Sequence, residues 1–231
     1  RMDRMTAQII DYDQARALMQ PGDVIAFGGS SAFSQIIKLV TFSEVSHVGV
    51  ILKTQIAEGN SELFFNQIIE STGKKGVSVS RFSQVLKDYD GEVWWLPLSD
   101  ELRESRFDVN AFFEFLYNQA DKNLSYDLSQ ALTSAVDVVE KLMFGEADVG
   151  HNKEDFSKFF CSELVAAGLE KSKAVDSINA SEITPIDLCR WKIYQGEYYV
   201  LKGDTEKNIS RFNSSEPNAW NRERDASTEI S

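Results

Sequence analysis

The expected fold is decided by one run of residues, Ser46-His47-Val48-Gly49-Val50-Ile51-Leu52. Its β-branched residues predict a strand. Gly49 carries no side chain, which lets another backbone or a helix approach the strand closely. His47 lies at the entry of this strand, where one ring nitrogen can face a cleft while the other is held by an acceptor. The run therefore predicts a strand with a candidate general base, and a His with a purely structural role is the alternative.

A second run, more than a hundred residues later, brings a thiol: Phe159-Phe160-Cys161-Ser162-Glu163-Leu164-Val165. The spacing of apolar residues predicts a helix over Ser157–Leu169. Cys161 is expected near its first turn, where the helix dipole lowers the pKa of a thiol. The chain holds two His and two Cys, and we interpret His47 and Cys161 as base and nucleophile. A buried Cys161 that packs as a small apolar side chain is the alternative.

A glutamate at the end of a neighbouring strand is the candidate partner of the imidazole. Glu70 follows the run Phe64–Ile69, which predicts a strand beside that of His47. A catalytic imidazole is oriented by a third polar group, and Glu70 is best placed for that role. Asn66 and Gln67 are alternatives, and so is an exposed Glu70 without a role.

The remaining pattern indicates the fold class. Apolar runs between turns predict strands at Val24–Phe27, Ser46–Leu52, Leu63–Ser71, Val77–Val79, Val93–Leu98 and Tyr198–Leu201. Helical spacing predicts helices at Thr6–Met19, Ser30–Phe42, Phe82–Tyr89, Glu101–Asp121, Leu128–Phe144 and Ser157–Leu169, with a short one near Ile183–Leu188. Strands come first, helices follow and a strand closes the order, so we expect an α+β fold with an antiparallel sheet.

The length of 231 residues allows one domain with a full core. We expect a helical N-terminal segment over residues 1–20 and the domain itself over 21–202. Residues 203–231 are polar, and we expect them to form a flexible tail.

The chain resembles a known superfamily through six motifs in a fixed order: Pro21-Gly22-Asp23-Val24-Ile25, Ser46-His47-Val48-Gly49-Val50, Glu70 followed by Gly76-Val77, Tyr126-Asp127-Leu128, Phe160-Cys161-Ser162-Glu163-Leu164-Val165 and Thr184-Pro185-Ile186-Asp187-Leu188. These motifs resemble the circularly permuted NlpC-type papain-like cysteine hydrolases. The YiiX-like group is most similar, and the lecithin retinol acyltransferase-like proteins are more distant. The resemblance spans Pro21 to Leu201.

The resemblance implies a permuted papain-like fold, with a small barrel-like antiparallel sheet packed against helices. It implies that Cys161 is the nucleophile, His47 the base and Glu70 the residue that orients it, and that Tyr126 lines the substrate cleft. Backbone N–H groups near Cys161 are expected to form the oxyanion hole. Residues 128–157 are longer than the usual connection and suggest a helical insertion at the cleft.

The implied activity is that of a thiol hydrolase or acyltransferase without a cofactor. Its substrate is expected to be a peptide-type amide, as in cell-wall peptides, or an acyl ester, as in lipids. The residues do not decide between these. A binding module with an unused Cys–His pair is the first alternative, and a structural or interaction protein of bacterial or phage origin is the second.

Composition excludes several other classes. The net charge of −12 argues against a nucleic-acid partner, which needs clustered Lys and Arg. No apolar run reaches about 18 residues, so no transmembrane helix is expected. No paired Cys/His spacing predicts a metal site. No signal-type stretch follows the N-terminus and both Cys are expected to be reduced, so we expect a cytoplasmic protein; Arg1 cannot be a start residue, which suggests a trimmed or added N-terminus. The oligomeric state stays open.

Overall fold

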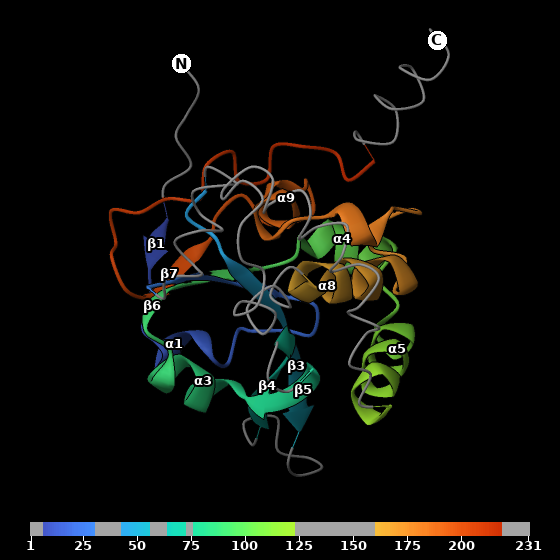
Figure 1. Cartoon of the computed structure of the whole chain (residues 1–231), viewed down its shortest axis with the longest axis horizontal. Coiled ribbons are helices and arrows are strands. Elements are labelled where there is room, and N and C mark those ends of the chain that lie inside the picture. The colour runs from blue at the N-terminus through green and yellow to red at the C-terminus, as the bar shows by residue number, and fades with distance from the viewer. Residues whose placement is uncertain (1–6, 31–42, 56–63, 73–75, 123–159, 219–231) are drawn as a thin grey trace, which may run out of the picture.

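The structure is a computed structural model, which describes residues 7–30, 43–55, 64–72, 76–122 and 160–218 (Figure 1). Its strands are β1 (Gln8–Ile9), β2 (Val24–Gly29), β3 (His47–Gln55), β4 (Phe64–Thr72), β5 (Gly76–Arg81), β6 (Gly91–Leu96) and β7 (Tyr199–Lys202). Its helices are α1 (Tyr12–Ala15), α3 (Phe82–Asp88), α4 (Asp100–Ser105), α5 (Val109–Asp121), α8 (Phe160–Lys171) and α9 (Pro185–Arg190), with a 3-10 turn at Ala180–Glu182. The described part is therefore a mixed α+β structure, as the order of the sequence patterns predicts.

The described strands form one sheet in the order β1-β7-β6-β2-β3-β4-β5. Neighbours are antiparallel except for β1 and β7, which run parallel. The order ends on β1 and β5, and no described strand joins these two edges. The sheet is therefore open in the described part, which corrects the expectation of a small barrel.

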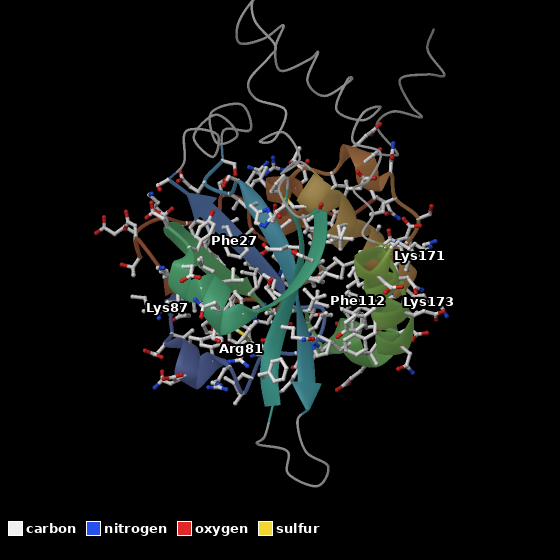
Figure 2. The ribbon with its side chains drawn as sticks, turned by 60° about the horizontal axis from the view of Figure 1, so that its bottom comes forward. Phe27, Arg81, Lys87, Phe112, Lys171 and Lys173 are labelled. Carbon is white, nitrogen blue, oxygen red and sulfur yellow. The ribbon has the colours of Figure 1, made fainter. Side chains whose placement is uncertain are left out.

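Each face of the sheet carries its own apolar core. Side chains alternate along a strand, so Ala26 and Trp94 belong to the larger core and Phe27 and Trp95 to the smaller one. Figure 1 shows α1 and α3 on one side of the sheet and α5 and α8 on the other. Figure 2 shows Phe112 on the side of α5 that faces the sheet. Because both faces are covered, all six residues of β2 are buried.

The N-terminal segment differs from the helical expectation for residues 1–20. Within the described residues 7–20, only Tyr12–Ala15 is helical, while Gln8–Ile9 forms strand β1. The backbone N–H of Gln8 donates to Tyr198 (2.9 Å) and that of Ile10 donates to Val200 (3.3 Å). Because these hydrogen bonds pair the segment with the edge of β7, it forms a strand there.

The helix expected over Glu101–Asp121 is two helices. Ser99 caps α4 through a hydrogen bond from the Leu102 N–H, and Asp108 caps α5 through a hydrogen bond from the Ala111 N–H (3.0 Å). A capping side chain starts a new helix, so Asp108 explains the break.

The segment after Lys202 also differs from expectation, because residues 203–218 pack on the domain. Phe212 is 5% exposed, and its ring centroid lies 4.5 Å from that of Tyr198 and 5.3 Å from that of Tyr194. The backbone N–H of Asn213 donates to the Cys189 carbonyl (3.2 Å). The burial of Phe212 thus holds this polar segment on the domain. Residues 219–231 and the expected insertion at 128–157 lie outside the described residues.

A buried carboxylate at the start of β2 joins three parts of the domain. Asp23 is 1% exposed, and it accepts hydrogen bonds from the N–H groups of Gln20 (2.9 Å) and Leu98 (3.0 Å) and from the indole of Trp95 (2.9 Å). The guanidinium of Arg103 in α4 forms an ion pair with it. Burial raises the pKa of Asp23 and Arg103 opposes that shift. Asp23 therefore links the turn before β2 to β6 and α4.

The first prediction concerns this anchor. Asp23→Asn leaves the Arg103 charge buried without its counter-ion, so we expect the free energy of unfolding to fall by about 3 kcal/mol in urea denaturation. Asp176→Asn is the control, because its ion pair with Arg106 is exposed and should contribute less than about 1 kcal/mol. Equal losses in the two variants would contradict the anchoring role of Asp23.

The second prediction concerns the packed segment. Phe212→Ala removes a buried ring, so we expect the free energy of unfolding to fall by about 3 kcal/mol in the same assay. Ile9→Ala, at a side chain that is 71% exposed, should change it by less than about 0.5 kcal/mol. A neutral effect of Phe212→Ala would show that the segment does not pack on the domain in solution.

Candidate active site

The imidazole lies at the first residue of β3. Phe27 of β2 lies opposite His47 in the antiparallel register, and the Ser46 N–H donates to the Phe27 carbonyl (2.8 Å). The His47 side chain is 9% exposed. The pairing of β2 with β3 thus places the ring at a strand end while keeping it largely out of water.

The carboxylate of Glu70 comes from the neighbouring strand β4. Its Oε2 atom lies 2.7 Å from Nε2 of His47. A Cβ atom at Gly49 would lie 2.7 Å from the Cδ1 atom of Ile68, so the glycine leaves room for the Ile68 side chain of β4 on this face of the sheet. The two alternative partners are engaged elsewhere: Asn66 donates to the Arg16 carbonyl (2.9 Å), and Gln67 accepts from the Tyr117 phenol (3.2 Å).

Helix α8 supplies the thiol of Cys161, which belongs to the larger core. Cys161 is the second residue of α8, which packs against β3 and β4. Its side chain is fully buried, and its charge and hydrogen-bonding capacity raise the pKa of the His47 ring, which places the thiol beside the imidazole. Glu70 occupies Nε2, and Nδ1 is buried. The structure thus brings His47, Glu70 and Cys161 together.

The electrostatics of this cluster favour a proton on the ring. Burial lowers the pKa of His47, but the charge and hydrogen bond of Cys161 and those of Glu70 outweigh it and raise the pKa from 6.5 to about 10. The thiolate is the nucleophilic form of cysteine, and an imidazolium beside it is the group that can balance its charge.

Two side chains near the ring have no motif in the sequence. The Phe27 ring centroid lies 5.2 Å from the imidazole, and the Tyr89 ring lies 4.7 Å from Phe27. The contact between Phe27 and His47 can be predicted from the sequence only if β2 and β3 are paired in the correct register. Tyr89 follows the end of α3 and carries no signal, because a contact between separate elements places it there.

The other candidate residues have different outcomes. Tyr126, expected to line the cleft, and His151, the second histidine, lie outside the described residues. Cys189 is fully buried in α9, and burial raises the pKa of its thiol. The two thiols therefore differ in surroundings: Cys161 faces an imidazole, whereas Cys189 is held in its neutral form.

The described residues carry neither a metal-binding cluster nor a membrane-spanning helix. Among the described residues, no group of three or more His, Cys, Asp or Glu side chains is arranged to hold a metal ion. None of the helices in the described ranges combines the length and apolar character needed to cross a bilayer.

Comparison with known proteins gives a weak similarity to solved structures. No family model matches the chain, and no curated protein matches it. The chain is similar to the crystal structure of metalloprotein yiiX from Escherichia coli O157:H7, with 16% sequence identity and a TM-score of 0.35 over 80% of this chain and 97% of that one. That protein bears the name of the YiiX-like group that the motifs resemble.

Proposed function

We propose that the chain is a thiol hydrolase or acyltransferase that acts on an amide or ester bond. The observation that carries the proposal is a buried imidazole flanked by the Glu70 carboxylate and the Cys161 thiol. A nucleophile next to a base that a third group orients is the usual arrangement for acyl transfer.

The proposed reaction has two steps. The Cys161 thiolate attacks the carbonyl carbon, a C–S bond forms, the C–N or C–O bond breaks, and His47 gives its proton to the leaving amine or alcohol. Water or another acceptor then attacks the thioester while His47 takes its proton, and the C–S bond breaks. Glu70 holds the ring through Nε2. Backbone N–H groups in the first turn of α8 are the proposed oxyanion donors.

The permuted papain-like topology is part of the same proposal. It is supported by chain order, with the base on an early strand and the nucleophile on a late helix, and by the six motifs. Cell-wall peptide amides and acyl lipids are the two substrate classes that we propose to test. The complete burial of Cys161 is the observation that favours the alternative, a binding module on the same fold in which the thiol does no chemistry.

The third prediction separates these possibilities by the reactivity of the two buried thiols. Cys161 faces an imidazolium and Cys189 does not, so we expect iodoacetamide to label Cys161 at least about tenfold faster than Cys189 at pH 7. Rates are measured by mass spectrometry in Cys189→Ala and Cys161→Ala, so that each variant reports one thiol. Equal rates would contradict a nucleophilic Cys161.

The same two variants test turnover. Activated acyl esters and peptide anilides should acylate Cys161 and be turned over by Cys189→Ala, while Cys161→Ala should lose about a thousandfold or more in rate. Retained turnover in Cys161→Ala would overturn the mechanism. A labelled Cys161 that neither accepts nor releases an acyl group from either donor class would favour the binding module.

The fourth prediction follows from the raised pKa of His47. The folded protein keeps this proton between pH 6.5 and about 10, where the unfolded chain has lost it. The contribution of His47 is therefore complete below pH 6.5, and stability should fall across this window by up to about 1.4 kcal/mol per pH unit for one proton.

Glu70→Gln removes one of the groups that raise the pKa, so the fall should be smaller and end at a lower pH. Denaturation at several pH values measures it. Glu92→Gln is the control, since Glu92 is a buried strand glutamate paired with Lys207 rather than with His47. A pH dependence in Glu70→Gln equal to that of the wild type would contradict the role of Glu70.

A further inference from the structure

Three aromatic rings from separate elements lie in a row that ends at the candidate base. Phe27 of β2 contacts the imidazole of His47 at 5.2 Å between centroids and the ring of Tyr89 at 4.7 Å. Phe27 is fully buried, so its position depends on the side chains packed around it, among them Tyr89. In Figure 2, Phe27 lies on the part of the sheet next to α3, the helix that Tyr89 follows. Tyr89 thus forms the outer end of the row, and Phe27 lies between it and His47.

The phenol of Tyr89 has a second connection to the same place. It lies near the hydroxyl of Ser46, the residue before His47, which lowers the pKa of the phenol. That hydroxyl also donates to the Phe27 carbonyl (3.3 Å) and accepts from the Gly29 N–H (3.3 Å). Burial raises the pKa of Tyr89 by more than Ser46 lowers it, and the charges of Glu70, Glu92 and Cys161 raise it further. The phenol therefore stays protonated.

Tyr89 is itself held by a lysine from the last strand. The ammonium of Lys202 in β7 donates to the carbonyls of Leu86 (2.9 Å) and Lys87 (3.0 Å) and to that of Tyr89. These carbonyls lie at the C-terminal end of α3, where a cation is favoured because the last carbonyls have no helical partner. All three N–H groups of the ammonium donate to carbonyls at the end of α3, so Lys202 fixes the position of the Tyr89 backbone.

We propose that Tyr89 is a positioning residue for the His47 base, acting through Phe27 and Ser46, with Lys202 as its anchor. The proposal rests on the proposed function for its chemical meaning, while its geometry stands without it. Removal of the Tyr89 ring frees Phe27 to move, and the imidazole then loses its fixed orientation between Glu70 and Cys161. The phenol adds a smaller part through Ser46.

The test measures the His47 ring directly. The chain has two histidines, so in a His151→Gln background NMR of the imidazole reports His47 alone. In Tyr89→Leu we expect the His47 pKa to fall by about one unit or more and the iodoacetamide rate of Cys161 at pH 7 to fall about tenfold. Tyr89→Phe keeps the ring, so the His47 pKa and the labelling rate of Cys161 should each fall by less than half as much as in Tyr89→Leu. Lys202→Met should shift both quantities in the same direction as Tyr89→Leu.

Two controls separate positioning from loss of stability. Tyr12 is another half-buried tyrosine of the smaller core, and it packs on Phe82 (5.4 Å between centroids) rather than on Phe27. Tyr12→Leu should destabilise the fold without moving the His47 pKa. Lys87→Met, at an exposed lysine in the last turn of α3 (Figure 2), should have no effect on the ring.

The outcomes distinguish this proposal from the proposed function. An unchanged His47 pKa in folded Tyr89→Leu, alongside a lowered pKa in Glu70→Gln, would overturn the role of Tyr89 and leave the function standing. Equal labelling of Cys161 and Cys189 in the wild type would overturn the function, whatever Tyr89 does. If Tyr89→Leu does not fold, Lys202→Met decides, and an unchanged His47 pKa there overturns the positioning role.

Discussion

The domain depends on one buried carboxylate that has a full set of donors. Asp23 carries a charge out of water, which is costly unless partners replace the lost hydration. Two backbone N–H groups, an indole and a guanidinium supply them. Strand β2 starts at the next residue, and β2 is the strand to which both β3 and β6 pair. The anchor therefore fixes the start of the strand whose register sets Phe27 opposite His47.

The balance of charges at the candidate site differs from that at Asp23. At Asp23 a cation balances one carboxylate, whereas at His47 two groups that can each be negative flank one ring. A buried imidazolium costs free energy alone, and the Glu70 and Cys161 charges more than offset that cost. The arrangement favours a charged imidazolium over a neutral imidazole at His47. The Oε2 atom of Glu70, 2.7 Å from Nε2, holds the ring in place.

Features that depend on residues close together in the sequence can be predicted from it, whereas features that depend on contacts between distant residues cannot. Strand periodicity predicts β3 and β4, and their antiparallel pairing is enough to bring His47 and Glu70 to one end of the sheet. The site residues proposed from sequence are therefore those carried by motifs on neighbouring elements. The break at Asp108 and the burial of Phe212 escape prediction. A single cap decides the first, and contacts with Tyr194 and Tyr198 decide the second. Tyr89 escapes for the same reason, because Phe27 and Lys202, which position it, lie far away in the sequence.

The base and the nucleophile consequently depend on different parts of the fold. His47 and Glu70 come from consecutive strands, so local pairing of β3 with β4 brings them together. Cys161 reaches them only because α8 packs on these strands through the larger core, which includes Leu164, Val165 and Leu169. A change that loosens α8 therefore separates the thiol from the ring while the His47–Glu70 pair persists. Without the thiolate the ring loses the larger of the two influences that raise its pKa, so the protonation of His47 reports the docking of α8.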